Sequence, residues 1–347
     1  MRSKIVRSFL SLVVSTLIAS CGTPATEAVV PTAAATEPSP PEATSTVAPT
    51  PSVTTSEDGA HSLSLVWQSE FTPEGALGAA VDIALDRAGN LYVTTASIKK
   101  YDSEGKFVTQ WGEKVGTGEG EFSLSTGIAT DWDGNVYVDD FRNRRIQKFD
   151  SDGNFLMQWP TDRAGSPGST VVDKDGNVFV SFFGSDEGNL QKYDPEGKLL
   201  LSWGGTGDGD GEFAGRIEDI AIDKDGNIYV TDSYNHRIQK FDNDGNFLMK
   251  IGGESSREGH GTFTNPLGIG VDYDGNIYVV DNFFLQKFDA QGNFITQWSR
   301  TQGGELDRAG FLTIDENNDI YILARSKITN ASGTFDVLFI KKFHPSW

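Results

Sequence analysis

Residues 219–251 read DIAIDKDGNIYVTDSYNHRIQKFDNDGNFLMKI, and this stretch decides the fold. Short apolar runs alternate in it with turns that contain glycine, which is the pattern of consecutive antiparallel strands joined by hairpins. The pattern predicts four strands, over Asp219–Asp223, Asn227–Asp232, Arg237–Asp242 and Asn246–Ile251. We name them a, b, c and d, with a innermost. Strands a and b are nearly continuous apolar runs, as expected for strands covered on both faces.

The same unit occurs six times along the chain. Its most constant part is Asp, two residues, Gly or Asn, a polar residue, and then an aliphatic, an aromatic and an aliphatic residue. The six copies of this part begin at Asp86, Asp131, Asp173, Asp223, Asp272 and Asp315. A period in the forties, built from short strands and glycine turns, is typical of β-propeller blades. The sequence therefore predicts an all-β protein, a six-bladed β-propeller with four-stranded antiparallel blades.

The ring is expected to close with a strand from the other end of the domain. The last copy stops after its strand c, at Ile340–Phe343, and has no strand d. The early segment Leu63–Trp67 matches Phe155–Trp159, a strand d, in spacing and character. We therefore expect the N-terminal strand to complete the last blade, which removes two open sheet edges. The predicted domain covers residues 61–347.

Two stretches of the repeats resemble a known family. Residues Asp232–Asp242, DSYNHRIQKFD, resemble the NHL repeat, and Asn143–Asp150, NRRIQKFD, are close to it. The resemblance covers essentially all of 61–347, although the first and last copies depart most from it. It implies the propeller fold. NHL-type propellers include protein-binding, RNA-binding, sensor and lyase members, so the resemblance does not select a function.

The segment before the domain has two parts. Residues 1–21 have the features of a secretory signal, with basic residues before an apolar stretch, Phe9–Ile18, that is too short to span a membrane. The stretch ends in Ile18-Ala19-Ser20-Cys21, which resembles the bacterial lipobox and implies a lipid on the Cys21 thiol. An ordinary signal peptide with an incidental cysteine is the alternative. Residues 22–60, rich in Pro, Thr and Ala, are predicted to be a disordered linker.

Composition limits the partners. The chain has 347 residues, 29 Lys and Arg against 49 Asp and Glu, and a formal net charge of -20. This charge argues against nucleic acid, because duplex binders neutralise phosphates with Lys and Arg. One cysteine can form neither an intramolecular disulfide nor a Cys-rich metal site. We expect an extracytoplasmic, monomeric propeller that reaches the bacterial envelope, at the outer membrane or cell surface, through its lipid anchor alone.

The motif Asp-x-Asp-Gly-Asn, as in residues 131–135 and 223–227, suggests calcium at first sight. A calcium loop of the EF-hand type, however, places its glycine sixth and a bidentate glutamate twelfth. Here the glycine is fourth and a strand follows at once. We expect a hairpin turn in which the aspartate accepts hydrogen bonds from the turn backbone. These a–b and c–d turns all lie on one face of the propeller, which we call the turn face.

The opposite face consists of the b–c and d–a loops, and we call it the loop face. Its loops are longer, more varied and richer in aromatic residues, and such loops on a rigid scaffold usually carry function. The candidates for contact with a ligand or partner are Phe141, Arg142, Phe182, Phe183, Tyr234, Phe283, Phe284 and Arg325. The adjacent phenylalanine pairs either fold inward between blades or form an exposed apolar patch. The Gly-rich stretch 204–211 is predicted to be a flexible loop.

A metal site at the axial mouth is an alternative. Asp82 and Asp219 occupy the same repeat position there, with Glu218 beside Asp219, and could hold a divalent cation as in some lactone-hydrolysing six-bladed propellers. The alternative is that these carboxylates cap strand ends, bind water or pair with Arg216 and Arg308. The sequence contains no Gly-x-Ser-x-Gly, HExxH or phosphate-loop motif, so we assign no catalytic residue and no cofactor.

The sequence thus favours a lipid-anchored binding or scaffold propeller that presents its loop face to a protein, peptide or glycan of the envelope. A metal-dependent hydrolase or lyase with a site at the axial mouth is the alternative function.

Overall fold

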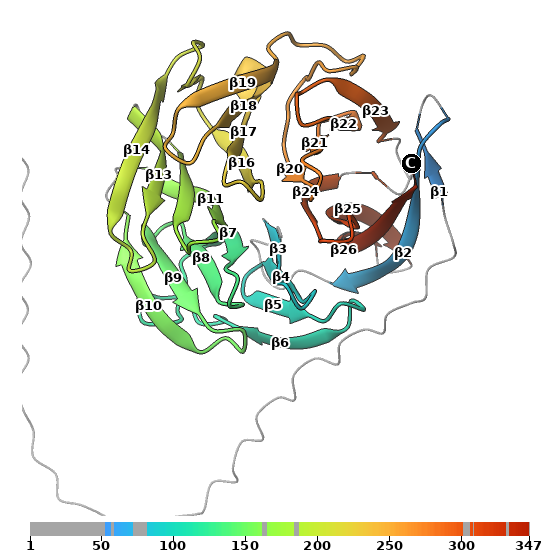
Figure 1. The fold of residues 1–347 in the computed structure, drawn as a ribbon. Helices are drawn as coiled ribbons and strands as arrows, with labels where there is room; N and C mark the ends of the chain where they lie inside the picture. Colours follow the sequence, from blue (N-terminus) through green and yellow to red (C-terminus); the bar gives the residue numbers. More distant parts are fainter. Residues whose placement is uncertain are drawn as a thin grey trace, which may run out of the picture. The chain divides into compact units, whose positions relative to one another are not determined.

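The computed structural model describes residues 53–56, 59–71, 82–161, 165–183, 187–300, 306–307, 309–330 and 333–346. They form six antiparallel sheets arranged as blades around a central axis (Figure 1). The predicted signal and lipobox cysteine, Cys21, lie outside these residues, as does the predicted linker up to residue 52. In the described part of the chain, no helix has the length and apolar character needed to cross a membrane.

Blades 1 to 3 follow one another along the chain, each with its strands in the order a to d. Blade 1 contains β3 (Ile83–Leu85), β4 (Leu91–Thr94), β5 (Ile98–Tyr101) and β6 (Phe107–Trp111). Blade 2 contains β7 (Ser125–Thr130), β8 (Val136–Asp140), β9 (Arg145–Phe149) and β10 (Phe155–Pro160). Blade 3 contains β11 (Ser166–Val172), β12 (Val178–Phe183), β13 (Glu187–Tyr193) and β14 (Leu199–Thr206), with the short parallel β15 (Glu212–Phe213) outside.

Blades 4 to 6 repeat this arrangement. Blade 4 contains β16 (Ile217–Ile222), β17 (Ile228–Asp232), β18 (Arg237–Phe241) and β19 (Phe247–Gly252), with the 3-10 turn η1 (Ser233–Asn235) after β17. Blade 5 contains β20 (Ile269–Val271), β21 (Ile277–Val280), β22 (Phe284–Phe288) and β23 (Phe294–Ser299). Blade 6 contains β24 (Ala309–Ile314), β25 (Ile320–Asn330) and β26 (Gly333–Ser346), followed in space by β2 (Ser62–Phe71) and β1 (Val53–Thr55).

The N-terminal strand closes the ring, as the sequence predicted. In Figure 1 the blue β2 lies along the red β26, and their register pairs Leu65 with Phe343. One feature was not predicted: β1 adds a fifth strand to blade 6 and pairs Val53 with Ser64. The folded part therefore reaches back into the segment that the sequence assigned to the linker.

The repeated aspartate motif is a hairpin turn, as expected. In blade 2 the Asp131 Oδ1 accepts the backbone N–H groups of Asp133 at 3.0 Å and Asn135 at 2.8 Å. Its Oδ2 accepts the Asn135 side-chain amide at 2.8 Å and the Tyr137 hydroxyl at 3.0 Å. Gly134 supplies the positive φ, 82°. The carboxylate is thus occupied by its own turn and by the buried aromatic residue of strand b.

Packing between blades forms the core, in six apolar clusters that each combine neighbouring blades. The tryptophan that ends a strand d also covers the c–d turn of the next blade. At Gly153 (φ 88°) an added Cβ would come within 2.7 Å of the Trp111 ring. Glycine is therefore required there both by its backbone conformation and by the close approach of the ring.

Candidate functional site

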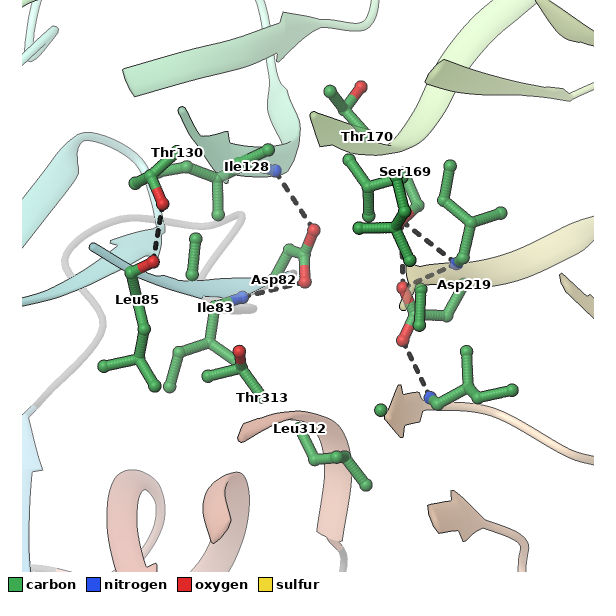
Figure 2. A pocket seen from close by; sticks show the side chains of 18 of the residues that line it. Asp82, Ile83, Leu85, Ile128, Thr130, Ser169, Thr170, Asp219, Leu312 and Thr313 are labelled. Carbon is green, nitrogen blue, oxygen red and sulfur yellow. Dashed lines mark hydrogen bonds between the residues drawn. The ribbon is translucent and has the colours of Figure 1, made fainter. Parts of the chain in front are cut away.

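The inner strands of the six blades surround a cavity on the propeller axis. It has a volume of about 170 Å³ and is lined by residues of β3, β7, β11, β16, β20 and β24. Figure 2 shows its lining, with Asp82 from blade 1 and Asp219 from blade 4 on opposite sides. Both side chains are buried. The rest of the lining is mainly aliphatic, with Ser169 and three threonines.

Each of these carboxylates joins its blade to the next one. Asp82 accepts the N–H of Ile83 at 2.8 Å and, across the blade boundary, the N–H of Ile128 at 3.0 Å. Asp219 likewise accepts its neighbour's N–H, from Ile220 at 2.9 Å, and that of Ile269 in blade 5 at 2.9 Å. The geometry is the same in both, so a pseudo-two-fold repeat relates blades 1 and 2 to blades 4 and 5.

Further hydrogen bonds tie blade 3 into this arrangement. The Ser169 hydroxyl donates to Asp219 Oδ1 at 2.9 Å, and the Thr170 hydroxyl donates to Asp139 of blade 2 at 2.5 Å. Asp139 is completely buried beside the axial strands. The polar groups at the axis therefore act as links between blades.

Burial weakens the acidity of these carboxyl groups. It raises the pKa of Asp139 and of Asp219 to about 7. The pKa of Asp82 is raised well above its usual value, first by burial and then by repulsion from Asp219. Removal from water penalises the charged form, and the second charge across the cavity adds to that penalty.

The three carboxylates predicted as a metal site do not converge. Glu218 is not among the residues that line the cavity, and its Oε2 pairs with Arg216 Nη2 at 2.8 Å. Among the described residues, no group of three or more His, Cys, Asp or Glu side chains is placed to hold a metal ion. The interpretation that Asp82 and Asp219 cap strand ends and that Glu218 pairs with arginine is the one that the contacts support.

On the loop face, the b–c loop of blade 4 presents Tyr234, whose side chain is 66 % exposed. The loop is fixed on both sides. Asn235 donates to Gly207 O at 2.9 Å in one neighbouring loop, and Ser233 donates to Pro266 O at 2.5 Å in the other. The left-handed residue His236 (φ 55°) ends the turn, with its Nδ1 2.8 Å from Thr264 O. Tyr234 is thus held out on a rigid support.

The b–c loop of blade 2 is built in the same way. Asn143 donates to Gly116 O at 2.7 Å, and Arg144 takes the left-handed conformation (φ 54°). Arg142 occupies the register position of Tyr234 and is exposed, whereas Phe141 is half-buried. Both predicted candidates therefore lie on the loop face, with Arg142 the more accessible.

The phenylalanine pairs differ between blades, and Phe182 follows the inward alternative, which removes it from the contact candidates. Phe182 is completely buried in the core between blades 2 and 3, because β12 continues through it. It cannot contact a partner. In blade 5 the strand β21 ends at Val280, so Phe283 lies in the loop and is 36 % exposed, while Phe284 is half-buried. The side chains of Phe183 and Arg325 lie outside the part of the chain whose side chains the structure describes.

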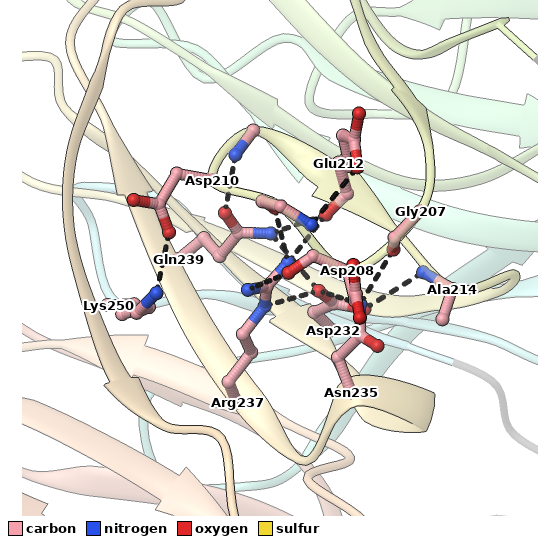
Figure 3. Close-up of polar contacts among 12 residues, drawn as sticks. Gly207, Asp208, Asp210, Glu212, Ala214, Asp232, Asn235, Arg237, Gln239 and Lys250 are labelled. Carbon is pink, nitrogen blue, oxygen red and sulfur yellow. Dashed lines mark hydrogen bonds and ion pairs between the residues drawn. The ribbon is translucent and has the colours of Figure 1, made fainter.

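The Gly-rich stretch 204–211, predicted to be flexible, is fastened by a buried arginine (Figure 3). Arg237 donates to Asp208 O at 2.8 Å, to Gly209 O at 2.7 Å and to Glu212 O at 2.9 Å. Its Nε forms an ion pair with Asp232. Arg145 holds the corresponding loop of blade 2 with the same set of contacts. The signal in the sequence was the Asp-x₄-Arg spacing shared by these two repeats.

Comparisons with known proteins agree with this architecture. Residues 215–241 match the NHL repeat, and residues 53–204 match the SMP-30/Gluconolactonase/LRE-like region. A stretch of 51 residues is 45 % identical to protein lin-41 of Caenorhabditis elegans. That match covers 15 % of this chain and spans only 4 % of the length of lin-41.

Solved structures show the same fold at low identity. A streptogramin B lyase is 13 % identical with a TM-score of 0.56, and the match covers 81 % of this chain and 98 % of the lyase. A gluconolactonase from Xanthomonas campestris is 17 % identical with a TM-score of 0.55, over 85 % of this chain and 94 % of that protein. At such identities the likeness concerns the fold alone. The chain is therefore a six-bladed β-propeller that carries an NHL repeat and an SMP-30/gluconolactonase-like region.

Proposed function

We propose that this protein is a non-catalytic binding propeller whose loop face captures a protein or peptide. The observation that carries the proposal is the exposure of Tyr234 on a turn that hydrogen bonds fix from both sides. A tyrosine held in this way contributes a large amphipathic contact and loses little conformational entropy on binding.

The surrounding residues support a protein partner. Besides Tyr234 and Phe283, the loop face exposes four arginines, namely Arg142, Arg144, Arg216 and Arg257. The Arg257 guanidinium lies 5.5 Å from the centre of the Phe283 ring. Tyrosine and arginine are enriched among the residues that dominate binding energies at protein interfaces. The d–a loops of the same face also expose acidic side chains, among them Glu119, Asp208 and Glu254, so the arginines are interspersed with carboxylates.

The enzyme alternative receives less support. The structural neighbours include a lyase and a gluconolactonase, but they share the fold with this chain and little of its sequence. The buried carboxylates at the axis, Asp82 and Asp219, use their oxygens to accept backbone N–H groups of adjoining blades. A catalytic acid, base or metal ligand needs oxygens that face the substrate.

The proposal includes a lipid anchor on Cys21, with the segment that follows serving as a tether. The lipobox-like sequence before the only cysteine supports it. Detergent phase partitioning of the full chain expressed in a bacterium tests this part. The wild-type chain should enter the detergent phase, and Cys21→Ser should move it to the aqueous phase. Equal partitioning of both would exclude the anchor.

Affinity capture with the full chain tests the loop face. Tyr234→Ala combined with Phe283→Ala should lose a discrete envelope protein that the wild-type chain retains. Leu200→Ala combined with Leu248→Ala is the matched control, because both leucines are about half exposed but lie on outer strands. Retention by the loop-face variant, or equal loss by the control, would contradict the proposal.

A further inference from the structure

A second surface lies on the turn face, on the opposite side of the propeller from the loop face. Each a–b turn places one side chain directly after its leading aspartate. Around the ring these residues are Arg87, Trp132, Lys174, Lys224, Tyr273 and Glu316, and all six are exposed. Two are aromatic: Trp132 is 56 % exposed and Tyr273 is 58 % exposed. They belong to blades 2 and 5, which are opposite each other in a ring of six.

The two aromatic residues have the same surroundings. In blade 2 the Arg87 guanidinium of the preceding blade lies 4.3 Å from the centre of the Trp132 ring. In blade 5 the Lys224 ammonium of the preceding blade lies 4.8 Å from the centre of the Tyr273 ring. An exposed aspartate, Asp133 or Asp274, follows each aromatic residue in the chain. Each site therefore combines a flat ring, a cation and a carboxylate.

The backbone under each ring is rigid. Asp131 Oδ1 accepts the Asp133 N–H at 3.0 Å, and Asp272 Oδ1 accepts the Asp274 N–H at 3.0 Å. Each of these bonds spans the aromatic residue, from the aspartate before it to the aspartate after it, and so fixes the turn that carries Trp132 or Tyr273. Binding to such a platform costs little ordering of the protein.

We propose that the turn face binds a neutral oligosaccharide, with one sugar ring against Trp132 and another against Tyr273. A pyranose has an apolar C–H face, which suits an exposed aromatic ring, and a rim of hydroxyls that both donate and accept hydrogen bonds. Lys224 and the terminal nitrogens of Arg87, whose Nε pairs with Glu316 at 3.3 Å, can donate to that rim. Asp133 can accept from it, as can Asp274, which also accepts the Asn318 amide at 3.4 Å. This surface is distinct from the loop face, so the proposal does not rest on the protein-binding function.

Charge excludes an acidic ligand. The a–b and c–d turns expose nine acidic side chains: Glu104, Asp133, Asp152, Asp175, Glu196, Asp225, Asp244, Asp274 and Glu316. They expose five basic ones: Arg87, Lys106, Lys174, Lys198 and Lys224. An acidic polysaccharide would be repelled by this excess of carboxylates, whereas a neutral one would not.

Calorimetric titration of the full chain with neutral hexasaccharides tests the proposal. Suitable probes are the hexamers of glucose, N-acetylglucosamine, xylose and mannose, with hexagalacturonate as the acidic control. At least one neutral hexamer should bind saturably. Trp132→Ala should weaken that binding about tenfold or more, which corresponds to about 1.4 kcal/mol. Trp132→Phe should restore part of it, and Tyr273→Ala should also weaken binding.

The choice of variants distinguishes a loss of sugar binding at this surface from a loss of folding. The position of Trp132 holds Arg, Lys, Tyr or Glu in the other blades, so alanine there leaves the fold intact. Leu248→Ala, an exposed outer-strand change, should bind as the wild type does. The proposal is overturned if none of the four neutral hexamers binds at millimolar concentration. It is equally overturned if Trp132→Ala binds as tightly as the wild type, or if hexagalacturonate binds as well as the neutral probes.

Discussion

Arg237 Nε lies 2.7 Å from Asp232 Oδ2, and both side chains are almost completely buried. The pair joins the end of strand b to the start of strand c in blade 4. The same guanidinium holds the preceding d–a loop through three backbone carbonyls. One arginine therefore determines the shape of two loops on the loop face, including the loop that carries Tyr234.

Removing this arginine should be costly. Arg237→Met takes away the cation that pairs with the buried Asp232 carboxylate, which keeps only neutral donors such as Asn235 and Gln239, and it removes a donor from three backbone carbonyls. The change should lower the free energy of unfolding by about 3–5 kcal/mol. Lys250→Met is the matched control, because Lys250 pairs with Asp210 of the same loop at 2.7 Å but is half exposed. It should cost no more than about 1 kcal/mol. Urea unfolding followed by tryptophan fluorescence measures both, and similar effects of the two changes would refute the role given to Arg237.

The aromatic position of strand b offers a paired test. The Tyr229 hydroxyl donates to Asp223 Oδ2 at 3.0 Å, whereas blade 3 has Phe179 at this position. Tyr229→Phe should lower the free energy of unfolding by about 1 kcal/mol, the usual contribution of one hydrogen bond. Phe179→Tyr should raise it by less than this, because Asp173 Oδ2 already accepts the Asn243 side-chain amide at 3.2 Å and the new hydroxyl must share that oxygen. Thermal melts would contradict this if both changes moved the midpoint in the same direction.

Stability should depend on pH in the direction set by the axial carboxyls. Burial raises the pKa of Asp139 and Asp219 to about 7 in the folded protein, whereas an unfolded aspartate titrates near its ordinary value of 3.8. Between these values the folded state binds more protons than the unfolded state, so stability falls as pH rises from about 4 to 7 and then levels off. Below about pH 4 the opposite effect begins, because hydrogen bonds lower the pKa of turn carboxyls such as Asp131.

Asp139→Asn should reduce this dependence. The change removes one titrating group, so the difference in unfolding free energy between pH 5 and pH 8 should shrink by roughly 1 to 4 kcal/mol. Asp150→Asn, in a turn at the surface, is the control. The hydrogen bond from the Asn154 side chain lowers the pKa of Asp150, so this carboxyl stays charged from pH 5 to pH 8 and its removal should leave the slope unchanged. Unfolding curves across this pH range provide the measurement. A wild-type protein that becomes more stable between pH 5 and pH 8 would contradict the prediction.

Close packing at the axis gives a fourth test. A Cβ added at Gly127 would lie 2.4 Å from Asp139 Oδ2 and 2.8 Å from Ser169 Cα in the next blade. Gly127→Ala should therefore lower the free energy of unfolding by about 1–3 kcal/mol or more. At Gly205 a Cβ would meet nothing within 4 Å, so Gly205→Ala should change stability by less than about 1 kcal/mol. Chemical unfolding of the two variants should separate them clearly, and equal stability would show that the inner strands can move apart.

The sequence was sufficient for the architecture because the repeat is periodic in its turns and strands. The leading aspartates placed six blades, and the match between Leu63–Trp67 and a strand d predicted the closure. It was not sufficient for β1, because a three-residue strand has no periodicity that distinguishes it from a linker. The sequence also could not predict whether the side chains of the phenylalanine pairs point into the core or into solvent. That direction depends on whether the strand continues through the residue. Phe182 lies within a strand and Phe283 lies beyond one.

The candidate sites show the same limit. The position of Asp82 and Asp219 at the axis followed from their place in the repeat, but their use in linking blades depends on backbone N–H groups of other blades. The sequence did not identify Trp132 and Tyr273 as a possible site, for a different reason. They occupy a turn position that is otherwise charged, and only the structure shows that a cation of the preceding blade lies over each ring.

The most direct test of the central claim is site-specific photo-crosslinking of the full chain in a bacterial envelope. A photoreactive phenylalanine analogue replaces Tyr234 in one variant and Leu200, on an outer strand, in another. Protein capture by the loop face predicts a discrete protein adduct from position 234 and none from position 200. An absence of adduct at position 234, or the same adducts at both positions, would contradict it.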